Sequence, residues 1–578
     1  MKKALVFAAA GVLALTLSAC AAGQPPQTAA PNQTSGAPSG PAGSAPSGAG
    51  WDINPQPYEA IKDGGTFTGV YGSQLTTWNL ATATGNDGEL KIALSPLSEG
   101  YMFTDGAGNL TVNPNFLTDL KEDASTGKTV ITMQLNPKAT WSGTTTPISA
   151  DDWIATWKAL NGSDKNYQAA STDGWDSIES MVQGASPQEV IITFKTLFPD
   201  WRMILVDTQP MPVEACKDAK TFNDGWGEYK QEWFSGPFVV SNFDKTSGMI
   251  TMTPSSTWWG EKPKLDKVVM KMVKPEGMAT AFANHEIDYI DIGPDASYYA
   301  LAKGATNSAI RVSEGSSFRQ FTFNSKSPIL SDQAVRQAIV MGLDRATIAA
   351  SDLAGLPVDP KPLNNNLFME GQDGYVDLGQ ATGIDFNVDK ANQTLDAAGW
   401  TLNASTGIRE KDGKPLAVTF AVLGGVKASE NEGLQAQKML KVIGVDLKLN
   451  VLDANKDWPG VLTSHNFDIV AFSWLGTPFP LAFVGQIYGE SSYPEGSNFA
   501  QLTIPQVETL LPQLASESDP AQRLVLGQQA AQAIWEAVHT LPLYQRPSLV
   551  GVPANVANIG ALGLASRPLT WTNIGYVS

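Results

Sequence analysis

The sequence predicts an α/β protein with more than one domain. The chain has 578 residues, and about 528 of them follow a low-complexity start, which is enough for about two or three domains. Beyond Phe323, segments with helical periodicity alternate with short apolar segments, a pattern that favours a mainly parallel or mixed sheet covered by helices. An apolar fraction of 42% and a charged fraction of 17% suit a folded, soluble body.

The first fifty residues predict export and a membrane tether. Met1–Lys3 is basic, and the apolar run 4–17 is shorter than the roughly 20 residues of a membrane-spanning helix. The quartet Leu17-Ser18-Ala19-Cys20 resembles a bacterial lipobox, so residues 1–20 are expected to be a lipoprotein signal peptide and Cys20 the lipidated residue. Residues 21–50 carry no charge and are expected to form a disordered Ala/Gly/Pro/Ser tether. We therefore expect a protein on the extracytoplasmic face of the bacterial cell membrane, with an uncleaved anchor or an ordinary signal peptide as alternatives.

The elements of the first half of the body are predicted by alternation and by helix-start residues. Glycines 64 and 65 predict a turn before a strand that extends to residue 71. Acidic residues at 151 and 152 predict the first turn of a helix that begins near residue 150. The remaining expected elements are a helix at 90–97, strands at 129–135 and 189–194, and strands at 268–273 and 287–292 around a helix at 277–284.

The second half has the stronger α/β pattern. Asp519 and Pro520 predict an N-cap and a first helical residue, so the last long helix is expected at 520–538. The other expected elements are helices at 332–343, 388–398 and 430–443, and strands at 418–423, 446–451 and 469–472.

Charge and cysteine content restrict the partners. The formal charge of −18 argues against nucleic acid and against anionic lipid surfaces. We expect membrane contact through the lipid on Cys20 only, and a monomer. If Cys20 is lipidated, Cys216 has no partner in the chain, so no disulfide is expected and a large core must provide the stability.

Common catalytic and metal-binding patterns are missing from the sequence. His285-Glu286 begins like a zinc-protease motif, but Tyr289 stands where its second histidine would be. No Gly-x-Ser-x-Gly elbow, zinc-spaced cysteine pair or EF-hand loop occurs. We therefore expect no metal, no cofactor and no enzymatic activity. The 16 tryptophans suggest a binding protein, because ligand sites combine aromatic walls with few polar groups.

A series of segments in order resembles the extracellular solute-binding protein family 5, the peptide- and nickel-type binding component of ABC importers. The resemblance covers about residues 64–550. Its most specific part runs from Phe323-Asn324 through Asp332–Ile339 to Asp344-Arg345. The other matching segments are 141–152, 236–238, 258–260, 284–290, 396–400 and 541–544.

This resemblance implies a two-lobed, periplasmic-binding-protein-like fold of the large peptide-binding class (type II), with an extra subdomain in the first lobe. The chain is expected to cross between the lobes near Phe318 and Pro542. The boundaries that it implies are 51–96, 232–318 and 542–578 for lobe I, 97–231 for its subdomain, and 319–541 for lobe II.

The resemblance also implies ligand-binding residues. In peptide-binding relatives, a Trp-x-Ala-Asp-Tyr-type segment supplies an Asp that pairs with the free amino terminus of the ligand. The matching residues here are Trp474, Gly476 and Thr477, so a hydroxyl stands in place of the carboxylate. A hydroxyl cannot neutralise a buried ammonium, so either another carboxylate does so or the ligand has no buried ammonium. Gly85 and Asn86, in a loop expected to present backbone to the ligand, and Phe321 complete the set.

The function implied is a lipid-anchored, substrate-binding component of an ABC importer. It would capture oligopeptides or similar extended solutes between the lobes and deliver them to permease subunits. Three alternatives stay open at this point: a non-peptide solute such as a sugar or an envelope-derived ligand, a non-transport scaffold that keeps the fold, and a secreted hydrolase that uses scattered carboxylates.

Overall fold

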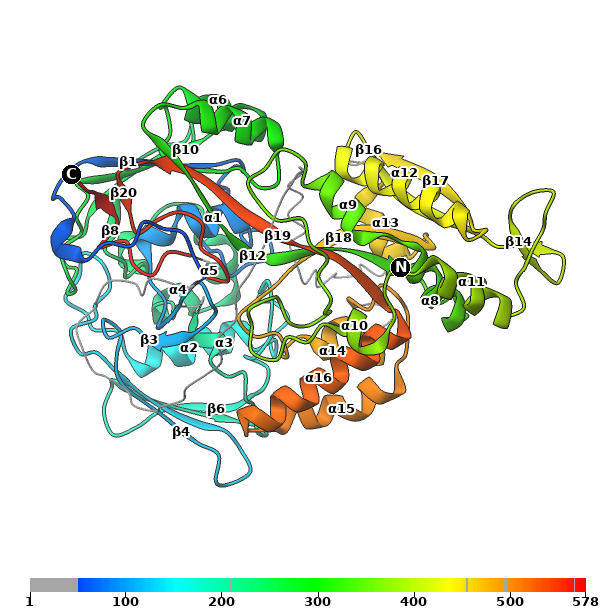
Figure 1. The fold of residues 1–578 in the computed structure, drawn as a ribbon. Helices are drawn as coiled ribbons and strands as arrows, with labels where there is room; N and C mark the ends of the chain where they lie inside the picture. Colours follow the sequence, from blue (N-terminus) through cyan, green and yellow to red (C-terminus); the bar gives the residue numbers. More distant parts are fainter. Residues whose placement is uncertain (1–49, 207–208, 454–455, 493–495, 566) are drawn as a thin grey trace, which may run out of the picture.

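The chain forms two lobes joined by two long antiparallel strands. These strands, β12 (Ser308–Phe323) and β19 (Thr540–Pro553), run across the middle of the molecule in the computed structural model (Figure 1). The predicted two-lobed α/β fold is therefore confirmed. The structure describes residues 50–206, 209–453, 456–492, 496–565 and 567–578.

The first lobe contains a four-stranded sheet in the order β1-β10-β9-β8. Strand β1 follows Gly64 and Gly65, whose φ angles of 102° and 95° lie in a region that glycine adopts readily. The predicted turn and strand at 64–71 are thus confirmed. The strands of this sheet are β1 (Thr66–Tyr71), β8 (Phe238–Asp244), β9 (Met249–Pro254) and β10 (Lys267–Met272).

A second sheet of the first lobe has the order β4-β5-β7-β6. Helix α2 (Ala150–Leu160) lies beside it and begins with a capping box, in which the Ser149 N–H donates to the Asp152 carboxylate at 2.9 Å. The helix start and the strands predicted for this region are confirmed. The strands are β4 (Leu117–Asp123), β5 (Val130–Leu135), β6 (Ile178–Gln183) and β7 (Glu189–Phe194).

Shorter elements complete the first lobe. The helix expected at 90–97 ends earlier, at Ala93, and a 3-10 turn that contains Pro96 follows it. The strand expected at 287–292 is only two residues long. The elements are α1 (Gly88–Ala93), β2 (Met102–Thr104), β3 (Leu110–Val112), α3 (Met203–Val206), α4 (Val213–Cys216), α5 (Ala219–Asp224), α6 (Pro275–Ala283), β11 (Ile290–Asp291), α7 (Ala296–Gly304), β20 (Val556–Ala557) and β21 (Gly575–Tyr576).

The second lobe has the predicted alternation of helices and strands. Its three main strands are β16 (Ala417–Gly424), β17 (Asp446–Asp453) and β18 (Ile469–Leu475), and a small sheet contains β13 (Thr401–Leu402), β14 (Arg409–Lys411) and β15 (Lys414–Pro415). The helices are α8 (Gln333–Gly342), α9 (Arg345–Asp352), α10 (Leu378–Thr382), α11 (Val388–Ala397), α12 (Lys427–Val442), α13 (Trp458–Ser464), α14 (Val484–Tyr488), α15 (Pro505–Ser516) and α16 (Pro520–Ala537).

One mixed sheet extends through both lobes in the order β11-β19-β12-β18-β16-β17. The pairing of β12 with β19 shifts between Glu314 and Phe318, where β12 bulges. A lobe crossing was predicted near Pro542 but no strand, and the structure has β19 there although it contains Pro542 and Pro547; proline is rare in central strands. The structure allows these prolines because β11 pairs with β19 only at Val550 and Gly551, which leaves the preceding part of β19 with an open edge.

The two faces of the crossing strands have different surroundings. Helices α6 and α7 cover one face, where Leu549 of β19 packs in a small core with Phe282 (Figure 1). On the other face Val550 belongs to the large core of the first lobe. Side chains alternate between the faces of a strand, so the face of each residue of β19 can be assigned.

Two large hydrophobic cores underlie the lobes. One core draws on both sheets of the first lobe and on the C-terminal segment around Trp571. The other draws on residues between Phe321 and Tyr544. The domain boundaries that the family resemblance implies for lobe I, its subdomain and lobe II stay a prediction.

The membrane-related predictions concern the start of the chain. The expected signal peptide at 1–20, Cys20 and tether residues 21–49 lie outside the described residues. Within the part of the chain that the structure describes, no helix has the length and apolar character needed to span a bilayer.

Candidate functional site

An aromatic wall stands at the end of β18. The rings of Trp474 and Phe499 are stacked, with centroids 5.9 Å apart and planes 9° apart. Phe472 meets both rings nearly edge-on, at 5.2 Å and 5.8 Å. Trp474 remains half-buried, so part of this large apolar surface can still contact a ligand.

The loop after β18 runs from this wall towards the first lobe. Leu475 is 52% exposed, and Phe479 packs against the core of the first lobe. The Gly476 N–H donates to the Ser316 carbonyl of β12 at 2.9 Å, and a Cβ on Gly476 would lie only 2.1 Å from that oxygen. Close approach of two backbones therefore requires glycine at 476.

Thr477 has a local partner. Its hydroxyl accepts a hydrogen bond from the Phe479 N–H at 3.1 Å, which fixes the turn of the loop. Thr477 is half-buried, and its side chain carries no charge. The predicted contact of Thr477 with a ligand stays a prediction.

A cluster of apolar side chains links the lobes beside Trp474. It contains Phe318, Leu363 and Met369 together with Leu564 from the C-terminal segment, and Trp474 packs against it. Trp474 therefore lies at the junction between the lobes, where movement of one lobe relative to the other would alter its surroundings.

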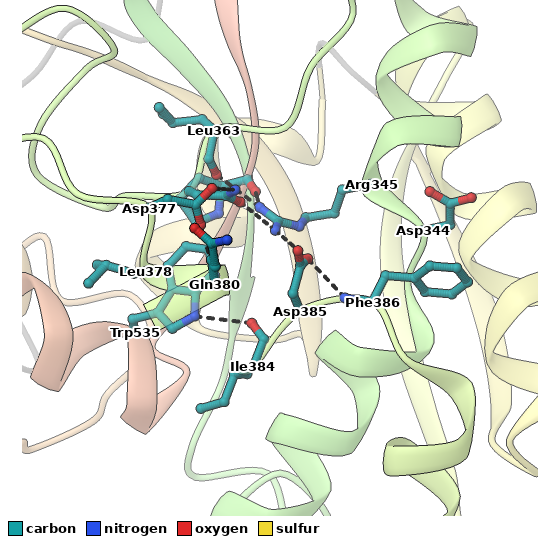
Figure 2. Close-up of polar contacts among 12 residues, drawn as sticks. Asp344, Arg345, Leu363, Asp377, Leu378, Gln380, Ile384, Asp385, Phe386 and Trp535 are labelled. Carbon is teal, nitrogen blue, oxygen red and sulfur yellow. Dashed lines mark hydrogen bonds and ion pairs between the residues drawn. The ribbon is translucent and has the colours of Figure 1, made fainter. Parts of the chain in front are cut away.

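A buried arginine holds the segment that carries Leu363. Figure 2 shows Arg345 at the start of α9, reaching the Leu363 carbonyl at 2.9 Å and Asp385 at 2.8 Å. It also donates to the Pro542 carbonyl of β19 at 3.0 Å. The Asp344-Arg345 pair of the sequence match therefore has a structural role: Asp344 caps the helix, and Arg345 ties it to a crossing strand.

Two opposite charges lie where the crossing strands leave the first lobe. Asp291 ends β11 and keeps solvent contact, yet burial raises the pKa of its carboxyl group. Arg546 of β19 is half-buried, and burial lowers the pKa of its guanidinium group. Both groups therefore keep contact with solvent while nearby protein makes their charged forms less favourable than in water.

An ion pair between Arg523 and Asp200 connects parts of the chain that pack in different cores. Arg523 of α16 forms a bidentate ion pair with Asp200, in which the Nη1–Oδ1 distance is 2.8 Å. The Asp200 side chain is 9% exposed. Asp200 precedes Trp201 of the first core, whereas α16 contributes to the second core. Arg523 lies in the first turn of α16, whereas the opposite, C-terminal end of that helix leads into β19 (Figure 1).

The predicted site residues are not all brought together. Gly85 is buried in its own loop, where a Cβ would lie 2.1 Å from the Asn79 carbonyl, and Asn86 is half-buried. Within the described ranges, no hydrogen bond connects either residue to the loop after β18. Their role as ligand contacts stays a prediction.

Phe321 needs a correction. It is 1% exposed inside the second core, with its ring edge-on to Phe420 at 4.9 Å. Phe321 follows the β12 bulge, so its side chain turns into the lobe rather than towards the junction. We therefore assign it to the core and not to the ligand.

Sequence reasoning missed Asp291, Arg546 and the Arg523–Asp200 pair. Isolated charged residues at strand ends carry no motif, and pairs so far apart in the chain cannot be recognised from one sequence. Cys216 behaves as a buried structural residue, because burial raises the pKa of its thiol to about 12. In the described part of the chain, no cluster of three His, Cys, Asp or Glu side chains could hold a metal ion.

The fold and this junction define a two-lobed binding protein of the periplasmic type. Solved structures agree: the periplasmic EDTA-binding protein EppA superposes with a TM-score of 0.80 at 22% identity, covering 90% of this chain and 98% of EppA. AppA from Bacillus subtilis, solved in complex with a nonapeptide, superposes with a TM-score of 0.67 at 20% identity, covering 90% of this chain and 100% of AppA.

The chain belongs to the bacterial extracellular solute-binding proteins, family 5, whose profile matches residues 111–494. The oligopeptide-binding protein OppA of Mycobacterium tuberculosis is 32% identical over 532 residues, which are 91% of this chain and 87% of OppA. The oligopeptide-binding protein AppA of Bacillus subtilis is 24% identical over 424 residues, 71% of this chain and 74% of AppA. The family assignment predicted from the sequence is confirmed.

Proposed function

We propose that the protein captures oligopeptides or similar extended solutes at the junction of its lobes and delivers them to an ABC permease. We further propose that a lipid on Cys20 keeps it at the extracytoplasmic face of the membrane, that it acts as a monomer and that it catalyses no reaction. The observation that carries the proposal is the half-buried Trp474–Phe499 wall beside a loop that reaches from one lobe to the other. The 32% identity to an oligopeptide-binding protein supports the ligand class.

The physical case for peptides is their backbone. An extended peptide always offers N–H and C=O groups, so a site that pairs with them gains affinity without selecting side chains. Enclosure between two lobes removes water, and each unpaired polar group then costs about 1–3 kcal/mol. Closure would therefore favour ligands that satisfy the site, and a permease can distinguish the closed form from the open one.

Calorimetric titration of the full-length protein with a pool of synthetic pentapeptides tests the ligand class. Saturable heat supports the proposal. No heat and no shift in melting temperature with peptides of any length would remove peptides as the ligand. Sugars and envelope fragments would then be titrated next, and mass spectrometry of the intact protein would show whether Cys20 carries lipid.

Removal of the Trp474 ring is expected to weaken peptide binding. Replacing Trp474 by alanine should cost about 1–3 kcal/mol of binding free energy, because the ring provides rigid apolar surface at the junction. Titration with the pentapeptide pool measures the change. Phe386→Ala is the matched control, since Phe386 is 47% exposed near α11. An equal affinity of Trp474→Ala and wild type would exclude Trp474 from the site.

A further inference from the structure

The position of Asp291 brings a carboxylate to the junction of the lobes. Asp291 pairs with Val550 of β19 and therefore shares its face of the sheet. Ser548 and Arg546 lie two and four residues before Val550 in the same strand, so they share that face as well. This is the face away from α6 and α7. Tyr289, two residues before Asp291, packs against the first core, as Phe479 of the loop after β18 does.

The Asp291 carboxylate is only partly satisfied within the protein. Its Oδ1 accepts one hydrogen bond from the Gly293 N–H at 2.8 Å. Among the described residues, no cation forms an ion pair with it within 4 Å. Burial raises the pKa of Asp291 more than the charge of Arg546 lowers it. A carboxylate that is surrounded by protein and open to solvent is stabilised by a cationic group that enters from solvent.

The other carboxylates near the loop after β18 already have a lysine. Glu370 forms an ion pair with Lys361, and the same lysine acts on Glu314. Glu314 follows Val312 by two residues, and Val312 packs on the α6–α7 side of β12. Glu314 therefore faces away from Asp291, although both side chains are exposed. Asp291 thus differs from Glu314 in its face of the sheet, and from Glu370 in having no ion pair within 4 Å among the described residues; the cation whose charge acts on it is Arg546.

We propose that Asp291 binds the positively charged amino group of the ligand and so replaces the carboxylate that is missing at Thr477. This assignment rests on the proposed peptide-binding function. The ligand's amino end then lies towards β11.

The test compares two forms of one probe with three proteins. A pool of synthetic pentapeptides is used with free amino termini and with acetylated amino termini; acetylation removes the ammonium charge and adds a small acetyl group, and the comparison between protein variants separates the two effects. Full-length wild type, Asp291→Asn and Asp291→Glu are titrated with each form. Wild type is expected to prefer the free amine by about tenfold or more. Asp291→Asn should lose that preference while keeping its affinity for the acetylated pool. Asp291→Glu should keep the preference for the free amine.

Glu314→Gln is the matched control, because it removes a carboxylate from the opposite face of the same sheet. Its preference for the free amine should equal that of wild type. Melting temperatures establish that each variant folds. If Asp291→Asn does not fold, Asp291→Ser, which also removes the carboxylate, takes its place with the same expected loss of preference.

Each outcome is informative. Wild type that binds both pools equally, or Asp291→Asn that keeps the preference, overturns the role of Asp291 and leaves peptide binding intact. If Glu314→Gln instead loses the preference for the free amine, the ligand's amino group lies on the other face of the sheet, and the role of Asp291 is overturned as well. Wild type that binds neither pool refutes the proposed peptide function and, with it, this assignment.

Discussion

Replacing Glu432 by alanine is expected to lower the free energy of unfolding by about 3–5 kcal/mol, because it leaves a buried guanidinium without its counter-charge. Arg319 of β12 donates from Nε and Nη2 to the two carboxylate oxygens of Glu432 at 2.6 Å and 2.5 Å. The Glu432 side chain is fully enclosed, and that of Arg319 is 10% exposed. Burial opposes the charge on Arg319, but Glu432 and its neighbours raise the pKa of the guanidinium above its usual value.

Chemical denaturation of wild type and Glu432→Ala measures this loss. Lys438→Ala, an exposed change on the same helix α12, is the control and should stay within about 0.5 kcal/mol. The double change Arg319→Met with Glu432→Leu removes both charges, so it should recover much of the lost stability. A Glu432→Ala protein as stable as the control would mean that water replaces the lost carboxylate.

The same cluster predicts a pH dependence of stability. Asp352 lies beside this pair and accepts a hydrogen bond from the Tyr544 hydroxyl at 3.3 Å. Burial, and then the charge of Glu432, raise the pKa of Asp352 to about 9, whereas an unfolded Asp has a pKa of about 3.9. The folded protein therefore holds a proton that the unfolded chain releases. The contribution of Asp352 to stability is complete below about pH 3.9 and falls as the pH rises towards 9.

Denaturation at several pH values between 5 and 9 tests that sign. Asp352→Asn should flatten the decline, because the amide has no proton to lose. If wild type and Asp352→Asn have parallel stability profiles, Asp352 is not the group responsible.

Removing the charge of Arg523 is expected to weaken ligand binding about 30-fold or more, equivalent to about 2 kcal/mol. Arg523 and Asp200 belong to segments that pack in different cores, and Arg523 lies in the first turn of α16, at the end of the helix opposite to β19. Rotation of the lobes about the crossing strands must separate them, so the pair stabilises only the arrangement in which the lobes are close. In the Arg523→Ala protein, part of the free energy of ligand binding must then stabilise the closed arrangement of the lobes, which the ion pair stabilises in the wild type.

Two measurements check the Arg523→Ala protein. Titration with the pentapeptide pool gives the affinity, and small-angle scattering without ligand gives the radius of gyration, which should increase. The charge exchange Asp200→Arg with Arg523→Asp should restore both values in part, whereas either single reversal should not. Unchanged affinity and unchanged scattering in Arg523→Ala would show that the pair has no influence on closure.

Local signals in the sequence were sufficient for several of the longer helices and strands. The capping box at Ser149 and Asp152, and Asp519 before Pro520, act over a few residues and set helix starts wherever the helices pack. The apolar periodicity of the second lobe likewise predicted its strands and helices. No strand was predicted at β19, whose prolines are compatible with a strand because β11 pairs with it only at Val550 and Gly551.

Some residues of the candidate site could likewise be predicted from the sequence, and others could not. Trp474 and Gly476 could be chosen from a segment that resembles one family, and the sequence also revealed that Thr477 is no carboxylate. Phe321 is 1% exposed in the second core, which the sequence did not reveal, because the face on which a β12 residue lies depends on the register shifts in its pairing with β19. Asp291, Arg546, Asp200 and Arg523 carry no local pattern, and their importance depends on distant neighbours.

The sequence by itself determined the class of the protein, its family and the alternation of its elements, since these depend on patterns within short stretches of chain. Only the tertiary structure decided which charged side chains meet at the junction and which aromatic residues are core. Burial and electrostatic interaction act between atoms that are close in space, and in this chain the relevant partners are separated by up to several hundred residues.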